Sequence, residues 1–242
     1  MTTESFSKSE IDRLGERLKR GDPSDADLRM LDAYRRAFGD AYEFVVATIR
    51  DRLRVKPTGR PAKSTTSVIE KLQRETVRLS QMQDIAGCRV VARNIVEQNR
   101  LLARVKKLFP NCTLADRRQR PSHGYRAVHV IVHVADRPIE IQVRSKLQHV
   151  WAEVSERLSD SVGIALKYGR GPKHLQDELL GAADIVAKLE EQEVSYAKVS
   201  KTLGRGNPQV RRNAATLRRA RTRTVKHLEE ISKLSDTIEL SE

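Results

Sequence analysis

The chain has 242 residues, of which 38% are hydrophobic and 32% charged, which suits one good core with long solvated helices and is short for three domains. Lysines and arginines number 46 against 32 acidic residues, and the resulting charge of +14 attracts polyanions such as nucleotides and RNA. Cys88 and Cys112 are too few for a disulfide framework, and neither a zinc-type spacing nor a signal-like or membrane-spanning apolar run occurs, so we expect a cytoplasmic protein with reduced cysteines and no membrane partner.

The N-terminal part is predicted to be helical up to a basic loop. Residues 1–23 form an arm whose sequence permits a helix without requiring one. Between Asp25 and Leu53, apolar residues recur at three- and four-residue steps, which predicts one amphipathic helix over most of this span. Two prolines and a glycine among the basic residues of positions 54–63 predict an irregular basic loop. Ser67 and Glu70 then match a capping box, which predicts a helix from there to about Leu79.

The middle of the chain is predicted to alternate strands and helices. Strands are expected at positions 88–92, 111–114, 125–134 and 137–144, with helices at 96–109 and 146–160. The last two strands are separated only by Ala135 and Asp136, which indicates a hairpin. This order favours an α/β or α+β core in which helices pack on a sheet.

Two closing helices of about thirty residues each are expected beyond position 171, separated by a break at 204–208. In the second helix, apolar or small residues repeat every seven positions: Val210, Leu217, Thr224, Ile231 and Ile238. Such a repeat forms a seam for another helix, either the preceding helix or a helix of another subunit in a homo-oligomer.

The two closing helices also carry an asymmetric charge. Residues 198–226, the basic stretch, contain ten lysines or arginines and no acid, whereas the final fifteen residues contain five acids and one lysine. A basic face of this kind can grip an RNA backbone. It can equally pair with the acidic tail or with a partner chain, and the sequence does not decide between these interpretations.

Polar residues alternate with apolar ones along the strand expected at 137–144. Glu140, Gln142 and Arg144 therefore share the face opposite the apolar residues. For an isolated strand, that face is more often simply the solvated side of an antiparallel edge. On the strand before it, Tyr125 and His129 are expected to share one face, where a tyrosine either stacks on a nucleobase or packs in the core.

Four segments in order resemble the synthetase domain of the RelA/SpoT family. They begin at Asp84 (Asp-Ile-Ala-Gly-Cys-Arg), Gly124 (Gly-Tyr-Arg-Ala-Val-His), Glu140 (Glu-Ile-Gln-Val-Arg) and Gln148 (Gln-His-Val-Trp-Ala-Glu). The resemblance spans about 54–168, and four linked motifs are far more specific than any single one. No His-Asp dipeptide of the family's hydrolase occurs, so the chain resembles a small, synthetase-only member, similar to the small alarmone synthetases.

The resemblance implies a nucleotidyltransferase-like mixed β-sheet flanked by helices, with the long C-terminal helices added. We expect an N-terminal arm at 1–23, a synthetase domain at 24–170 and a helical extension at 171–242. The implied reaction is that of a GTP pyrophosphokinase of the stringent response, in which the β,γ-pyrophosphate of ATP is transferred to the 3′-hydroxyl of GDP or GTP to make the alarmone (p)ppGpp.

The resemblance also implies roles for individual residues. Asp84 and Glu140 correspond to the acids that bind Mg²⁺ and act in catalysis, and a hard cation does favour carboxylate oxygens. Glu140 is the expected base. Tyr125 corresponds to the tyrosine that stacks on the acceptor base. His129, Gln142 and Arg144 complete the expected acceptor side.

The ATP site is expected to be basic. Arg60, Lys63, Ser67, Lys71 and Arg89 correspond to the residues that hold the triphosphate. Two residues separate Arg60 from Lys63 where relatives have one, and the nearby basic residues at 54 and 56 are alternatives to Arg60.

Two further functions are considered. The first is a toxin-like small synthetase, paired with an antitoxin, that pyrophosphorylates the 3′ CCA end of tRNA and uses the basic stretch to hold it. The second is a non-catalytic RNA-binding regulator, against which the intact acids Asp84 and Glu140 argue.

Overall fold

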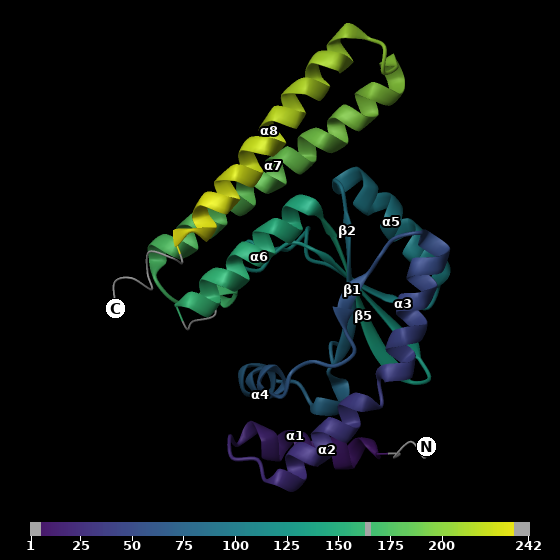
Figure 1. The fold of residues 1–242 in the computed structure, drawn as a ribbon, viewed down its shortest axis with the longest axis vertical. Helices are drawn as coiled ribbons and strands as arrows, with labels where there is room; N and C mark the ends of the chain where they lie inside the picture. Colours follow the sequence, from purple (N-terminus) through teal and green to yellow (C-terminus); the bar gives the residue numbers. More distant parts are fainter. Residues whose placement is uncertain (1–5, 163–165, 235–242) are drawn as a thin grey trace. The chain divides into compact units, whose positions relative to one another are not determined.

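The computed structural model describes residues 6–162 and 166–234 of the chain (Figure 1). By its internal contacts, the chain divides into two compact units that alternate along the sequence. The first unit comprises 1–90, 104–114 and 129–142, and the second comprises 91–103, 115–128 and 143–242. In the described residues, no helix is both long and apolar enough to cross a membrane.

The elements follow the expected order of helices, a mixed sheet and closing helices. The helices are α1 (Lys8–Lys19), α2 (Asp25–Arg36), α3 (Gly39–Leu53), α4 (Thr65–Arg74), α5 (Ile95–Leu108), α6 (Lys146–Ser161), α7 (Lys173–Leu203) and α8 (Pro208–Ser232), with 3-10 turns η1 (Leu79–Gln81) and η2 (Leu166–Tyr168). The strands are β1 (Thr58–Arg60), β2 (Ala86–Ala92), β3 (Thr113–Asp116), β4 (Val128–Val134) and β5 (Arg137–Ser145). They form one mixed sheet in the order β1-β2-β5-β4-β3, which confirms the predicted fold class.

The single helix expected between Asp25 and Leu53 is wrong, because the chain forms α2 and α3 with a break at Ala37 and Phe38. Phe38 is fully buried and packs edge-on against Tyr34 at a centroid distance of 5.3 Å. The apolar periodicity continues across the break, so it conceals the helix boundary. Gly39, the first residue of α3, was the available signal, since glycine is a poor helix former.

The irregular loop expected at 54–63 is also corrected, because it contains the edge strand β1. Gly59 lies opposite Cys88 of β2, and a Cβ on Gly59 would lie only 2.4 Å from the carbonyl oxygen of Gly87. Glycine therefore permits a strand pairing that a side chain would prevent. Pro57 and Pro61 flank the strand and do not interrupt it.

Helix α4 begins earlier and ends earlier than expected. Ser64, not Ser67, is the N-cap, and its hydroxyl accepts a hydrogen bond from the Ser67 backbone N–H at 3.2 Å. The helix ends at Arg74 and Leu79 belongs to η1. A serine three residues before another serine offers the backbone a cap one turn sooner.

The hairpin of β4 and β5 turns at Ala135 and Asp136, as predicted, and both have positive φ (46° and 59°), as a tight two-residue hairpin turn requires. Strand β4, however, begins at Val128, so Tyr125 is not on it and the expected shared face of Tyr125 and His129 is wrong. Gly124 explains the difference, because its φ of +85° turns the chain just before Tyr125.

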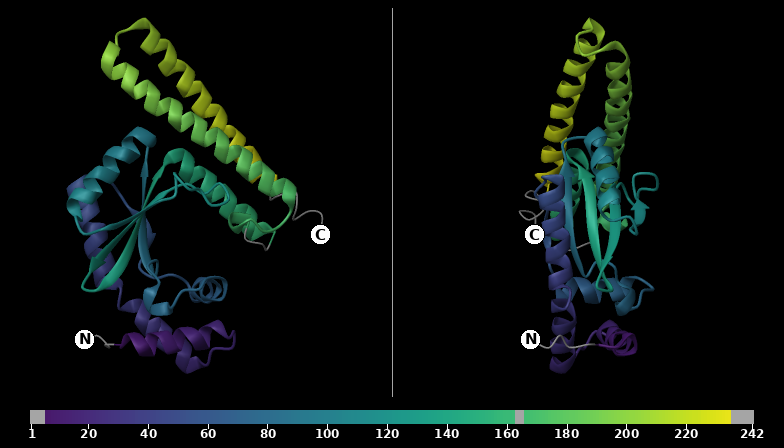
Figure 2. Two further views of the ribbon diagram at one scale, coloured as in Figure 1. Left: turned by 180° about the vertical axis from the view of Figure 1, so that it is seen from behind. Right: turned by 90° about the vertical axis from the view of Figure 1, so that its right-hand side faces the viewer.

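The second unit contains the closing helices. Helices α7 and α8 lie side by side and contact α6 (Figure 1 and Figure 2). Their apolar seam joins Trp151 of α6 in a buried cluster with residues such as Leu179 of α7 and Leu228 of α8. The preceding helix is thus a partner of the heptad repeat in α8. Ile238, the last residue of that repeat, lies outside the described residues.

Candidate functional site

Asp84 lies in the turn before β2 and is held by two lysines. Its carboxylate oxygens accept hydrogen bonds from the Nζ atoms of Lys63 and Lys71, both at 2.8 Å. Burial would raise the pKa of Asp84, but the charges of Lys71 and Lys63 outweigh it and lower that pKa to about 2. Asp84 is therefore a carboxylate at any physiological pH. Its side chain keeps 18% exposure, so a ligand can reach it.

Glu140 lies on β5, where an imidazole and an amide hold its carboxylate. His129 of β4 donates from Nδ1 to one carboxylate oxygen at 2.6 Å, and the Gln142 amide donates to the other at 2.7 Å. Burial acts to raise the pKa of Glu140, but the bonds and charge of His129, with the Gln142 bond, lower it overall. The nearby charge of Asp84 acts in the opposite direction. The charge of Asp84 thus acts on Glu140, which favours the prediction that the two acids belong to one site.

Arg60 falls in a row with Glu140 across three strands of the sheet. Arg60 of β1 lies opposite Gly87 of β2. A Cβ on Gly87 would lie 3.2 Å from the Cβ of Glu140. Because residues that face each other across a sheet have side chains on the same side, Arg60 and Glu140 share a face. Arg89, two residues beyond Gly87, is on that face too.

Ser67 and Lys71 lie one turn apart on α4, so they project from the same side of the helix. The Ser67 hydroxyl accepts a hydrogen bond from the Ser64 hydroxyl at 2.9 Å. Lys63 is fixed just before this helix, where its backbone N–H donates to the Ile85 carbonyl at 2.6 Å. The first unit thus brings Lys63 and Lys71, two of the four expected basic residues, to Asp84.

Two of the expected acceptor residues lie in the second unit. There Arg144 donates from Nη2 to the Tyr125 hydroxyl at 2.9 Å, and its guanidinium lies 5.1 Å from the centre of the tyrosine ring. Arg144 is only 2% exposed. Because Tyr125 and Arg144 are both predicted to bind the acceptor, we call them the acceptor pair. His129 bonds Glu140, and its expected role on the acceptor side stays a prediction.

The acids satisfy the demands of a magnesium ion better than those of zinc. Among the described residues, no group of three or more histidine, cysteine, aspartate or glutamate side chains converges. Mg²⁺ typically uses one or two protein carboxylates and fills its remaining positions with water and phosphate oxygens. Asp84 and Glu140 are ionised, are partly exposed and interact through their charges, so they fit such an ion.

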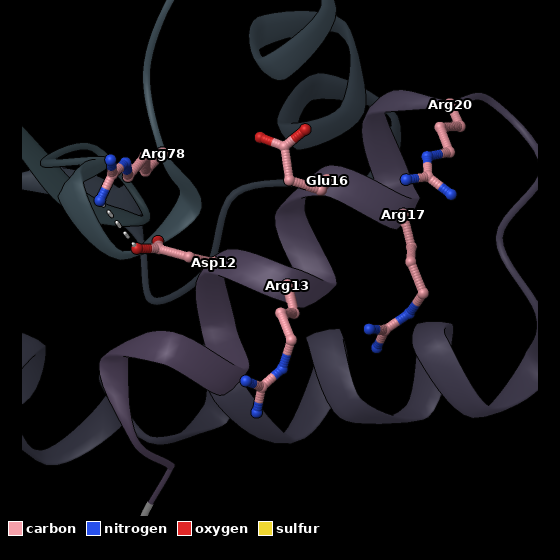
Figure 3. A pocket seen from close by; sticks show the side chains of 6 residues that line it. All are labelled: Asp12, Arg13, Glu16, Arg17, Arg20 and Arg78. Atoms are coloured by element: carbon pink, nitrogen blue, oxygen red, sulfur yellow. Dashed lines mark ion pairs between the residues drawn. The ribbon is translucent and has the colours of Figure 1, made fainter.

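One surface pocket of the first unit lies outside the expected site. A surface pocket of about 560 Å³ is lined by residues of α1 and the segment before η1: Asp12, Arg13, Glu16, Arg17, Arg20 and Arg78 (Figure 3). No expected site residue lines it. Its charges are mixed, and Arg17 and Arg78 pair with acids at 2.7 Å and 3.9 Å. The ion pairs and the exposure of these side chains are typical of a solvated helix face. Asp84 and Glu140 therefore give a better candidate site than this pocket does.

Cys88 lies on β2 but faces away from the acids and takes no part in the site. It is 3% exposed, and burial, with the charge of Glu140, raises the pKa of its thiol to about 12. It is therefore an inert structural thiol, as expected.

The sequence did not predict a buried polar network in the second unit, built on Glu190 of α7. Glu190 is 2% exposed and contacts Ser145, Gln148 and Arg126. The signal was present, because Glu190 follows Val186 by one turn on the apolar face of α7, where an unpartnered charge would be costly.

Comparison with known proteins agrees with this architecture. The fold resembles that of the small alarmone synthetase 1 of Bacillus subtilis, with a TM-score of 0.53 and 21% identity over 74% of this chain and all of that one. Residues 59–159 match the region found in RelA / SpoT proteins, so this part of the chain is similar to that family.

Relatives of similar sequence occur in mycobacteria. The uncharacterized proteins Rv1366 of Mycobacterium tuberculosis and Mb1401 of Mycobacterium bovis are each 37% identical to this chain over 134 residues. The aligned part covers 54% of this chain and 47% of each relative. The chain thus aligns with about half the length of these relatives.

Proposed function

We propose that the chain is an ATP-dependent pyrophosphokinase that transfers the β,γ-pyrophosphate of ATP to the 3′-hydroxyl of GDP or GTP, making (p)ppGpp. The observation that carries the proposal is the pair of ionised acids, Asp84 and Glu140. Lysines hydrogen-bond Asp84, and His129 hydrogen-bonds Glu140. Both acids lie in the part of the chain that matches the family. The catalytic part would span 24–170.

The ATP phosphates are assigned to the basic groups of the first unit. Lys63 and Lys71 hold Asp84 by their ammonium groups, and a bound triphosphate would offer them phosphate oxygens instead. Arg60 and Arg89 share the face of the sheet that carries Glu140. Because Arg60 is on this face, it is a better candidate than the basic residues at 54 and 56.

Mg²⁺ is the proposed cofactor, with Asp84 and Glu140 as its protein ligands. When bound, the ion would neutralise charge on the phosphates as the β-phosphorus is attacked. Asp84 can serve as a ligand because its pKa of about 2 keeps it ionised.

Glu140 is the proposed base. The 3′-hydroxyl oxygen forms a bond to the β-phosphorus, the bond from that phosphorus to the oxygen bridging to the α-phosphorus breaks, and AMP leaves. Glu140 takes the hydroxyl proton, which its lowered pKa permits because the group is ionised at neutral pH. His129 and Gln142 fix the carboxylate by one bond to each oxygen. We therefore assign these two residues to orienting the base, and Tyr125 with Arg144 to the acceptor.

The test is to offer ATP and Mg²⁺ with GDP, GTP, ADP and tRNA side by side to the purified protein, and to identify which acceptor gains the diphosphate. Formation of a 3′-pyrophosphorylated guanine nucleotide together with AMP supports the proposal. If neither GDP nor GTP is modified while the protein is folded, the proposal is wrong.

A second candidate function, pyrophosphorylation of the tRNA 3′ end, is favoured by the exposed basic face of α8. Arg212, Arg219, Arg223 and Lys226 are exposed and recur at helical spacing on the side away from the apolar seam. Of these four residues, only Lys226 has an ion-pair partner within the described part of the chain, which is Glu230 at 3.7 Å. Exposed cations along one helix face suit an RNA backbone.

This candidate predicts a steep salt dependence. Replacing Arg219 and Arg223 by glutamate should weaken tRNA binding and flatten the dependence of affinity on salt. The matched control is Lys188→Glu, which reverses an exposed charge on α7 outside the basic stretch. The wild type, the Arg219 and Arg223 variant and Lys188→Glu are also incubated with tRNA and labelled ATP. Equal tRNA affinity of these three proteins, with no label transferred to the CCA end, would exclude this function.

A further inference from the structure

Glu190 is an acid in the apolar interior of the second unit. It lies on α7, next to Leu189 and one turn beyond Val186, and all three side chains are buried. Glu190 itself is 2% exposed. A buried carboxylate without partners is strongly destabilising, so an acid at this position needs donors around it.

The donors come from two other segments of the chain. The Ser145 hydroxyl donates to Glu190 at 2.5 Å, and the Gln148 amide donates to both carboxylate oxygens at 2.9 Å and 3.0 Å. The guanidinium of Arg126 lies 3.6 Å from the carboxylate. Gln98 completes the network, because its amide donates to the Val143 carbonyl and the Gln148 side chain.

Two of these partners are the direct neighbours of the acceptor pair. Arg126 follows Tyr125 in the chain, and Ser145 follows Arg144. Ser145 is also the N-cap of α6, where its hydroxyl accepts from the Gln148 backbone N–H at 3.2 Å. Glu190 therefore holds, through one carboxylate, the two segments whose adjoining side chains bond each other.

The segment before Tyr125 rests on the same helix. A Cβ on Gly124 would lie 2.8 Å from the Trp151 ring and 2.9 Å from the Cβ of Ala183 on α7. The Trp151 indole N–H in turn donates to the Leu179 carbonyl of α7 at 2.8 Å. The loop that carries Tyr125 is thus packed on α7 at Gly124 and linked to α7 at Arg126.

We propose that Glu190 is a positioning residue for the acceptor, which makes α7 part of the acceptor site although it lies beyond the matched residues 59–159. By holding Arg126 and Ser145, Glu190 keeps Tyr125 and Arg144 in the arrangement that receives the acceptor nucleotide. The assignment of that pair to the acceptor rests on the proposed function.

Glu193 offers a matched control one turn further along α7. Its side chain is 12% exposed, and its carboxylate accepts hydrogen bonds from Arg221 at 2.8 Å and from the Ile95 backbone N–H at 3.4 Å. These partners do not adjoin the acceptor pair in sequence. Glu193→Gln therefore removes a charge from the same helix with a comparable effect on packing.

The experiment measures KM for the acceptor and for ATP, with kcat, in the wild type, Glu190→Gln and Glu193→Gln. Glu190→Gln should raise KM for the acceptor about tenfold, because the amide keeps the shape but loses the charge that holds Arg126. Its KM for ATP should stay within twofold, and Glu193→Gln should change neither value. Ser145→Ala, which removes one bond and leaves the carboxylate, should show a smaller effect of the same kind.

A purely structural role predicts a different result, namely a fall in stability and in active fraction with equal effects on both substrates. That result, or unchanged acceptor KM in both Glu190→Gln and Ser145→Ala, would overturn the proposal.

Hydrogen exchange provides a readout that does not need turnover. Exchange in segments 124–128 and 144–148 should increase in Glu190→Gln and not in Glu193→Gln. A wild type that modifies no acceptor would refute the proposed function alone, and exchange that is unchanged in Glu190→Gln would refute the positioning role alone.

Discussion

Asp84 should stabilise the folded chain in a pH-dependent way, and the size of the effect follows from its surroundings. Burial opposes its ionisation, but the charges of Lys71 and Lys63 lower its pKa from 3.8 to about 2. A shift of this size corresponds to about 2 kcal/mol. Because the folded pKa is the lower one, this stabilisation is present above pH 3.8 and is lost as the pH falls towards 2. About 1 kcal/mol of it should be lost by pH 3.

Urea unfolding followed by circular dichroism at pH 6 and pH 3 measures this loss. Between these conditions, the wild type should lose about 1 kcal/mol more stability than Asp84→Asn, which has no carboxyl group to protonate. Asp184→Asn is the control, because Asp184 is exposed on α7, and it should follow the wild type. If Asp84→Asn shows the full pH dependence of the wild type, the two lysines do not hold Asp84 as described.

Three further outcomes are expected. Glu140→Gln should lower turnover by two to four orders of magnitude, on the order expected for loss of a general base, with an unchanged circular dichroism spectrum; a variant that keeps more than a tenth of the activity would contradict its role. Gly124→Ala should cost about 2 kcal/mol or more, seen as a lower Tm, because its φ of +85° and the Trp151 ring leave no room for a Cβ; an unchanged Tm would contradict this packing. In a thiol titration of the native protein Cys112 should react and the buried Cys88 should react only after unfolding, whereas rapid reaction of both thiols would refute the burial of Cys88.

The sequence predicted those parts of the fold that depend on local patterns. The hairpin of β4 and β5 followed from alternating residues around a two-residue turn, and the closing helices followed from their periodicity and the break between them. The break at Phe38 was not predicted, because the apolar positions keep helical spacing through it. Strand β1 was not predicted either, since its pairing depends on the distant segment around Gly87.

The candidate site was predictable only as a set of residue types. Linked motifs pointed to Asp84 and Glu140, but which groups hold them is decided by the ends of long side chains from other elements. His129 illustrates this, because its sequence position indicated an acceptor role and its hydrogen bond goes to Glu140. Glu190 required the packed structure, since its partners lie 42 or more positions away along the chain.

Strand β1 has a consequence for self-association. Its three residues form an edge strand of the sheet. The prolines at 57 and 61, on either side of it, have no backbone N–H to donate. A strand from a second copy would find too few main-chain donors there to extend the sheet. Any homo-oligomer that this chain forms should therefore not grow by strand addition at that border.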